Sequence, residues 1–343
     1  MATTFKTLVL DKDVANTRTM LHEAIPLTGT IVSGTYGDEN IKNYAHGMFQ
    51  SVYDYPYLSS SANHIFDLTV GYASGSALNT ATSVQNSKKI NIYNQMAQVL
   101  VGYDATGSIR EFDRDGNFAG GGDTLKECLF INFSRLLTKD EIKKGSFIFT
   151  ALTGGTPVAP TDALTIQDHG AASTYLTNSP AGEYAVLYTG SAAVAGTGVG
   201  LLYYQTGIAV LTASVFDGTF GAPAATYDTS SIEAVLTGSE ISSSCDGIRN
   251  RWQDCDYNNT TELNSTIYFC RASSNEFNYS SNPTYLSGSK IRVKNVSTDS
   301  PSAYITTIGL YSEDNELLAV AKVSEPLKKD PTNELTLRVR LDY

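Results

Sequence analysis

The chain has 343 residues, with 24 Lys and Arg against 35 Asp and Glu, and therefore carries a net charge of −11 at pH 7. This acidic balance argues against binding to nucleic acid or anionic lipid, and the length suits one large domain or two to three smaller ones. No apolar run approaches the roughly 18 residues of a membrane-spanning helix. Residues 1–6 lack a charged leader followed by an apolar run. We therefore expect a chain that is made in the cytosol and does not span a membrane.

Residues 1–62 indicate an N-terminal arm with short helices. A helix is expected over residues 14–25, and Pro26 would end it. The residues at roughly helical spacing are Val14, Arg18, Leu21, His22 and Ile25. A second short helix is expected over residues 38–49. Residues 53–58 (YDYPYL) are expected to be extended, because a proline disfavours the helical conformation in the residue before it.

Residues 63–231 indicate a β-rich domain with one amphipathic helix. The helix is expected between residues 83 and 101, where Ile92, Met96 and Val99 or Leu100 form an apolar stripe. A capping box at Thr138 predicts a single helical turn. Strands are expected at residues 65–72, 127–138, 146–152, 183–190 and 200–216.

Residues 232–343 indicate a C-terminal β-sandwich part, either separate or sharing one core with residues 63–231. The polar stretch 232–264 is expected to be irregular. Strands are expected at residues 265–272, 290–296, 304–311, 316–323 and 334–343, and the last alternates strictly between apolar and polar residues. The whole pattern predicts a mainly β fold, an antiparallel β-sandwich or sandwiches with a few short helices and long loops.

The sequence offers little support for catalysis. The four histidines (His22, His46, His64 and His169) lack metal spacing, the four cysteines fit neither a metal pair nor a disulfide-rich domain, and no nucleophile elbow or phosphate loop is found. We expect neither enzymatic activity nor a cofactor.

Residues 111–117 (EFDRDGN) are similar to the start of a calcium loop, with Asp113, Asp115 and Asn117 as candidate ligands. The pattern fails at its twelfth position, which is Gly122, and Arg114 adds a positive charge. A hairpin turn at D-G-N is therefore favoured over a metal site.

Three segments follow one another near the C-terminus: residues 305–311 (ITTIGLY), 317–321 (LLAVA) and 335–339 (LTLRV), with Pro326 in a charged loop between the last two. This arrangement resembles the baseplate-attachment segments of phage tail-fibre proteins.

A further ordered set of segments covers most of the chain. Its members are residues 65–72 (IFDLTVGY), 89–102 (KINIYNQMAQVLVG), 127–136 (ECLFINFSRL), 265–272 (STIYFCRA) and 276–285 (EFNYSSNPTY). The set is similar to that of virion structural proteins of large contractile-tailed phages, including phages of marine cyanobacteria.

These resemblances imply a non-enzymatic structural component of a tailed-phage virion, assembled in the host cytoplasm and located in the tail or baseplate or at the tail-fibre attachment. The implied partners are other virion proteins, among them tail, baseplate or neck subunits and the tail fibre, and further copies of this chain in a homo-oligomer. Aromatic residues of the N-terminal arm and of segment 276–285, and basic residues of the last strand, are the candidate assembly residues: Tyr53, Tyr55, Tyr57, Phe277, Tyr279, Arg338 and Arg340.

Two other functions stay open. A neck or capsid decoration protein would share the acidic, β-rich character but follow a different symmetry in the particle. A receptor-binding or carbohydrate-binding module would present a solvent-facing pocket lined by tyrosines and Trp252.

Overall fold

The computed structural model describes residues 5–28, 37–80, 83–118, 124–156, 159–190, 192–216, 231–238, 240–280, 286–287, 290–291, 298 and 301–343. The described chain is mainly β with antiparallel strands, as the sequence predicts, and it divides into two compact units. Unit 1 comprises residues 1–20 and 262–343, and unit 2 comprises residues 21–261. These limits differ from the expected division at residues 62 and 231, because unit 1 combines both ends of the chain.

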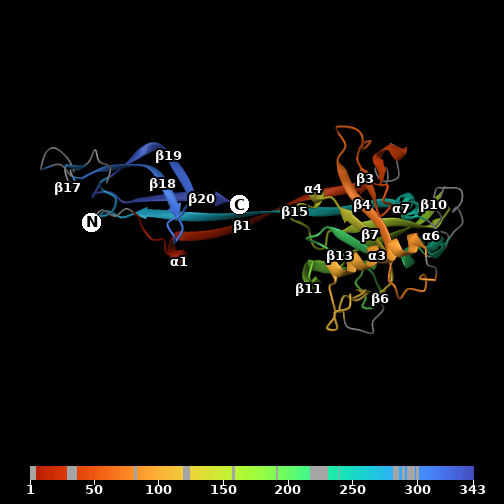
Figure 1. The fold of residues 1–343 in the computed structure, drawn as a ribbon. Helices are drawn as coiled ribbons and strands as arrows, with labels where there is room; N and C mark the ends of the chain where they lie inside the picture. The colour runs from red at the N-terminus through yellow and green to blue at the C-terminus, as the bar shows by residue number, and fades with distance from the viewer. Residues whose placement is uncertain are drawn as a thin grey trace. The chain divides into compact units, whose positions relative to one another are not determined.

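Unit 2 is built on one long antiparallel sheet. Its main strands are β2 (Ile41–Asn43), β3 (Gln50–Tyr53), β4 (His64–Tyr72), β7 (Glu127–Phe133), β9 (Ile148–Gly155), β10 (Pro160–Gln167), β12 (Gly182–Thr189), β13 (Gly198–Tyr203), β14 (Ile208–Thr212) and the first part of β15 (Trp252–Ala272). Hydrogen-bonded neighbours follow the order β15-β9-β10-β12-β13-β14-β7-β4-β3-β2. Figure 1 labels β3, β4, β7, β10, β13 and β15 among them. Because hydrogen bonds join these strands into one sheet, a sandwich of separate sheets is not confirmed.

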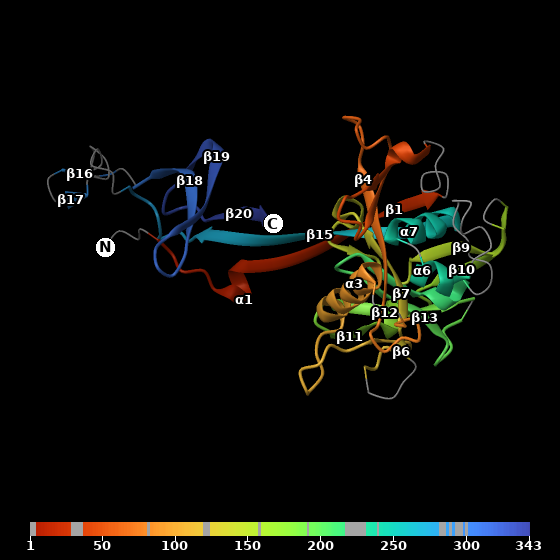
Figure 2. The ribbon, with the colours of Figure 1, turned by 45° about the vertical axis from the view of Figure 1, so that its right-hand side comes forward.

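Short elements complete unit 2. The short strands are β5 (Phe112–Asp113), β6 (Thr124–Leu125), β8 (Glu141–Ile142) and β11 (Leu176–Ser179). The helices are α3 (Val84–Leu100), α4 (Arg135–Thr138), α5 (Ala171–Thr174), α6 (Ile232–Gly238) and α7 (Ile241–Asn250), with 3-10 turns η1 (Gly37–Asn40) and η2 (Ala213–Phe216). Helices α3 and α7 both contact β4 (Figure 2).

Helix α3 confirms the predicted helix over residues 83–101. It begins after Ser83, whose Oγ accepts a hydrogen bond from the Asn86 N–H at 3.1 Å, so the first turn is capped. Ile92 and Leu100 of the predicted stripe are buried, whereas Val99 is exposed.

The core of unit 2 lies between strands that are far apart in the hydrogen-bonding order. The Phe66 ring on β4 stacks on the Trp252 ring on β15, with centroids 4.8 Å apart and an interplanar angle of 3°. Phe149 on β9 meets the same indole edge-on at 4.8 Å. The sheet therefore curves so strongly that strands far apart in its order lie opposite each other. The apolar side chains pack between these strands.

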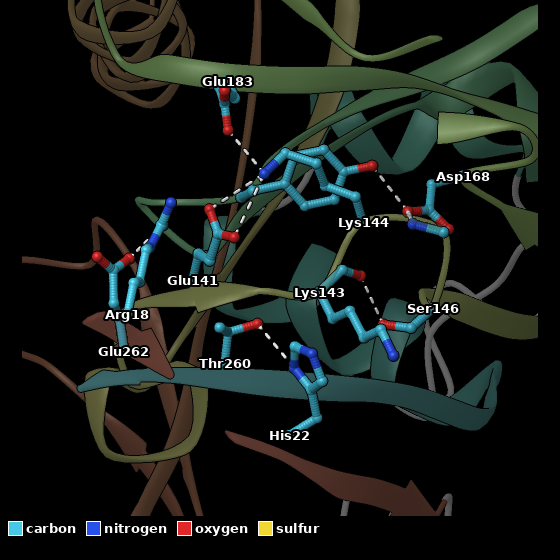
Figure 3. Close-up of polar contacts among 12 residues, drawn as sticks. Arg18, His22, Glu141, Lys143, Lys144, Ser146, Asp168, Glu183, Thr260 and Glu262 are labelled. Atoms are coloured by element: carbon cyan, nitrogen blue, oxygen red, sulfur yellow. Dashed lines mark hydrogen bonds and ion pairs between the residues drawn. The ribbon is translucent and has the colours of Figure 1, made fainter. Parts of the chain in front are cut away.

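The helix expected over residues 14–25 is wrong, because β1 (Val14–Thr28) occupies this stretch and only α1 (Leu10–Asp13) before it is helical. Strand β1 neighbours β15 in the sheet. Hydrogen bonds to β15 satisfy backbone N–H and C=O groups of β1 that would otherwise need the local hydrogen bonds of a helix. Within unit 2, the Trp252 Nε1–H donates to the Leu27 carbonyl at 3.2 Å, and His22 Nδ1 lies 3.2 Å from Thr260 Oγ1 (Figure 3). Pro26 is tolerated because β1 ends the strand order.

Three further expectations are corrected. Residues 38–49 contain η1 and β2 instead of a helix, because β2 pairs with β3. The helical turn α4 ends at Thr138 instead of starting there, since Lys139 has φ 57° and β8 follows, paired with β15. Residues 232–264 are regular: they form α6, α7 and the first half of β15.

Unit 1 contains the three C-terminal strands that the sequence predicts. They are β18 (Ala303–Tyr311), β19 (Leu317–Lys329) and β20 (Leu335–Asp342), accompanied by the short β16 (Leu286–Ser287) and β17 (Lys290–Ile291). Strand β20 pairs antiparallel with residues 265–272 of β15, and its burial alternates as expected, with Val339 most buried. Residues 292–296 of the expected strand 290–296 lie outside the described residues.

Candidate interaction surface

The β18–β19 hairpin contains two of the three segments that follow one another near the C-terminus, residues 305–311 and 317–321. A short turn joins the two predicted strands: the Ser312 N–H donates to the Glu316 carbonyl at 2.8 Å, and Asn315 takes a left-handed φ of 64°. Residue pairs across the strands include Ile308 with Ala321 and Gly309 with Val320. The register shifts between Leu310 and Tyr311, so Leu318 is bulged out of the ladder.

The register assigns two faces to the hairpin. Partners that lie directly opposite one another point to the same side, so Ile308 shares a side with Ala321, and Leu310 shares it with Ala319. These four side chains are buried or half-buried. They form the inner face.

The opposite side is apolar and exposed. A Cβ added at Gly309 would lie 2.9 Å from the Tyr311 ring and 3.3 Å from Leu317 Cδ1, so both side chains cover this glycine. The exposed fractions are 59% for Tyr311, 53% for Leu317, 68% for Leu318 and 51% for Val320. We call Gly309, Tyr311, Leu317, Leu318 and Val320 the outer face. A contiguous apolar surface of this kind on a strand pair is typical of a protein interface.

The described part of unit 1 buries little apolar surface of its own. Its buried apolar residues are Ile267, Ala272, Ala303, Leu310 and Val339, and their exposed fractions are 6% to 9%. The large apolar cluster of the protein, which runs from Leu27 to Tyr257, belongs to unit 2. The exposed outer face is therefore large relative to the core of its own unit.

Three of the predicted assembly residues lie in unit 2, on and after β3. Tyr53 packs against Tyr57, with ring centroids 6.3 Å apart, and against His64 at 5.5 Å. Tyr55 and Tyr57 are exposed. Tyr57 also lines a shallow hollow of about 540 Å³ together with Ile41 and Leu58.

The other predicted assembly residues lie in unit 1. Phe277 and Tyr279 are half-buried, and residues 281–285 of the aromatic loop lie outside the described residues. Arg338 and Arg340 are exposed on β20. Arg340 Nε donates to Asp342 Oδ1 at 2.6 Å, and its Nη2 donates to Ser265 Oγ at 3.0 Å. Unit 1 thus holds four of the seven predicted residues.

Sequence reasoning did not nominate the outer face as an assembly site. The signal was present: Leu310 with Tyr311, and Leu317 with Leu318, are adjacent apolar pairs that break the apolar–polar alternation of a strand with one buried face. Such a break predicts either a strand that is buried on both sides or a strand that meets a partner.

Of the candidate cation ligands, Asp113 ends β5, which pairs antiparallel with β6, and Asp115 and Asn117 follow it in the chain. Asp113 Oδ2 accepts the Phe118 N–H at 3.0 Å, and Asp115 Oδ1 accepts the Asn117 N–H at 3.2 Å. Burial raises the pKa of the Asp113 carboxyl. These two carboxylate oxygens therefore accept hydrogen bonds from backbone N–H groups of nearby residues. Among the described residues, no group of three or more His, Cys, Asp or Glu side chains is arranged to hold a metal ion.

A second polar cluster surrounds Lys144 in unit 2 (Figure 3). Lys144 Nζ lies 2.6 Å from Glu183 Oε2 and 3.2 Å from Glu141 Oε2. Burial alone would lower the pKa of Lys144, but its contacts with these two carboxylates outweigh burial and raise the pKa. The amine therefore stays charged and fixes the segment that follows β8.

Asp168 anchors the same segment from the other side. Its carboxylate accepts the Gly145 N–H at 2.6 Å, the Phe147 N–H at 3.0 Å and the Tyr204 hydroxyl at 2.7 Å. Burial raises the pKa of Asp168, against the effect of these hydrogen bonds. The carboxylate is buried, so its geometry suits a structural anchor and not a solvent-facing catalytic group.

Trp252, which a sugar-binding pocket would use, is buried beneath Phe66 with 3% of its surface exposed. Tyr44, Phe49, Lys88 and Glu240 line a different hollow, of about 220 Å³. Tyrosines thus line hollows in unit 2, whereas Trp252 lines neither of the two that we describe.

Among the described residues, no helix combines the length and the apolar character that crossing a membrane requires. Comparison with protein-family models, curated proteins and solved structures yields no match to this chain.

Proposed function

We propose that this chain is a non-enzymatic structural component of a tailed-phage virion, located in the tail or baseplate or at the tail-fibre attachment. It acts by packing against neighbouring subunits. The observation that supports this most directly is the outer face, because it contains residues of the segment that resembles the baseplate-attachment region of tail-fibre proteins and exposes their apolar side chains.

The mechanism is geometric. An exposed apolar strand pair gains stability when a neighbouring subunit removes it from water, at about 25 cal/mol for each Å² of apolar surface. The inner face of the hairpin is buried or half-buried, so the paired strands present Tyr311, Leu317 and Val320 on their exposed side. Main-chain groups at the strand edges are available for strand addition as well.

Cryo-electron microscopy of the intact particle tests this proposal, with the chain located by its density. We expect copies ringed around the tail or baseplate, with the outer face covered by a neighbouring subunit. Copies on the head lattice would assign it to capsid decoration instead, and copies at the neck would assign it to that position. Absence from purified particles would contradict a virion role altogether.

A glycan-binding role is the second candidate, favoured by the hollows that Tyr44 and Tyr57 line in unit 2. Binding of the purified protein to an array of bacterial surface glycans, abolished by Tyr44→Ala, would support it. A blank array would remove it.

A further inference from the structure

We propose that unit 1 is a self-association module, in which the outer face of the β18–β19 hairpin is covered by the outer face of another copy of this chain. This inference deepens the proposed function and rests on it, since it names the partner of the same surface.

The first argument is the size of the core. Unit 1 has about a hundred residues, and a folded domain of that length normally buries well over half of the surface of its unfolded chain. Its described residues include five buried apolar side chains, none below 6% exposure. An association that buries the outer face would add to the small apolar burial seen among the described residues of the unit.

The second argument is charge. Unit 1 carries twelve Lys and Arg and twelve Asp and Glu residues, so its net charge is zero. Unit 2 carries twelve Lys and Arg and 23 Asp and Glu, so the whole net charge of −11 belongs to unit 2. The zero net charge of unit 1 means that two copies of this unit meet without a net repulsion between them, whereas two copies of unit 2 would repel each other. A strongly charged partner, in contrast, would find no opposite net charge on unit 1.

The third argument is area. The four large residues of the outer face expose on the order of 400 Å² in total, which is about half of the roughly 800 Å² that each partner contributes to an interface of standard size. Exposed Thr307 and Lys322 pair with each other beside the outer face and provide a polar rim. The face is thus large enough to form the centre of an interface between two copies.

Sedimentation velocity of the full-length protein over a hundredfold range of concentration tests the inference. We expect wild-type protein to sediment as an oligomer whose proportion rises with concentration. In Leu318→Lys/Val320→Lys, each interface would have to bury lysines of both copies, and we expect the apparent dissociation constant to rise roughly 100-fold or more.

The matched control is Val99→Lys/Leu136→Lys, which also replaces one Val and one Leu. These residues are 61% and 69% exposed, but they lie on α3 and α4 of unit 2. We expect the control to sediment like wild type. Circular dichroism checks that both variants are folded. If one of them is not, the concentration dependence of the wild-type sedimentation still tests the inference by itself.

Wild-type protein that is monomeric at every concentration would overturn the inference, as would an oligomer that the hairpin variant leaves intact. These results differ from failure of the proposed function. A monomer that is found in the tail of the particle contradicts self-association alone, whereas an oligomer that is absent from the particle contradicts the virion role alone.

Discussion

At the scale of single residues, Lys89 is the most unusual side chain of unit 2. It lies on the buried side of α3 with none of its surface exposed, and its amine donates to the Leu236 carbonyl. Burial lowers the pKa of Lys89 from its ordinary 10.5 to about 8. Lys89 lies three residues before Ile92, so it shares the buried face of the helix with that residue.

This pKa makes the stability of the protein depend on pH. Below about pH 8 both folded and unfolded states hold the proton, so the contribution of Lys89 is constant. Between about 8 and 10.5 the unfolded chain binds the proton more tightly, so the contribution of Lys89 to the free energy of unfolding rises with pH, by about 3 kcal/mol over the window. We expect Lys89→Met to remove this rise.

Urea unfolding at pH 7 and pH 10 measures the change in the free energy of unfolding with pH, for wild type and for Lys89→Met. Subtracting the two changes removes the contributions of the other titrating groups, which both proteins share. Lys88→Met is the control, because its neighbouring amine is only half-buried and donates to the His46 carbonyl. An unchanged pH dependence in Lys89→Met would refute this account of Lys89.

At the scale of elements, the packing of α3 on β4 depends on Gly71. A Cβ at this position would lie 2.7 Å from the Lys89 carbonyl oxygen and 2.9 Å from the Tyr93 nitrogen. Both are backbone atoms of the helix, so neither can move aside without shifting α3. We expect Gly71→Ala to lower the free energy of unfolding by about 1–3 kcal/mol in chemical denaturation.

Gly238→Ala provides the comparison for Gly71→Ala. Gly238 closes α6, and a Cβ there would meet nothing within 4 Å, so we expect no loss and a gain of up to about 1 kcal/mol. Equal effects of the two substitutions would show that close packing at Gly71 is not what limits this contact.

The elements that could be predicted from sequence are those fixed by neighbours in the chain. Helix α3 has its own cap and stripe, and β18, β19 and β20 have short turns and clear alternation. The prediction for residues 14–25 was wrong because the partner of β1, strand β15, is more than two hundred residues away in the sequence. No local pattern indicates that pairing. Tertiary pairing overrode a weak local preference.

The candidate site was predicted in part for the same reason. The sequence located the hairpin and its turn, and the resemblance drew attention to its residues. Which side of the hairpin is covered, however, depends on the bulge at Leu318 and on the packing of the inner face. Exposed Tyr55 and Arg338 were nominated from residue type alone, which does not reveal a continuous surface.

At the scale of the whole molecule, the two units differ in how they are stabilised. Unit 2 has its own apolar core, whereas unit 1 combines a small core with an exposed apolar face. If copies cover that face, hydrogen exchange in residues 303–323 should slow as protein concentration rises, because association stabilises the folded form by mass action.

Hydrogen exchange mass spectrometry at low and high protein concentration provides the measurement. Peptides from α3 and β7, which lie in unit 2 and away from the proposed contact, should exchange equally at both concentrations. In Leu318→Lys/Val320→Lys the concentration dependence of residues 303–323 should disappear. Concentration-independent exchange of the wild-type hairpin would contradict the expected stabilisation.

Gly309 has a consequence for the conformational entropy that assembly costs. Because the Tyr311 ring and Leu317 already rest on the bare backbone of Gly309, their rotamers are restricted before any partner arrives. Ordering a flexible side chain at an interface costs about 0.5–1.5 kcal/mol, and a preorganised one avoids much of that loss of conformational entropy. A single methyl group at residue 309 would lift the ring and make it mobile. The smallest residue of the hairpin thus keeps its largest side chain ready for contact.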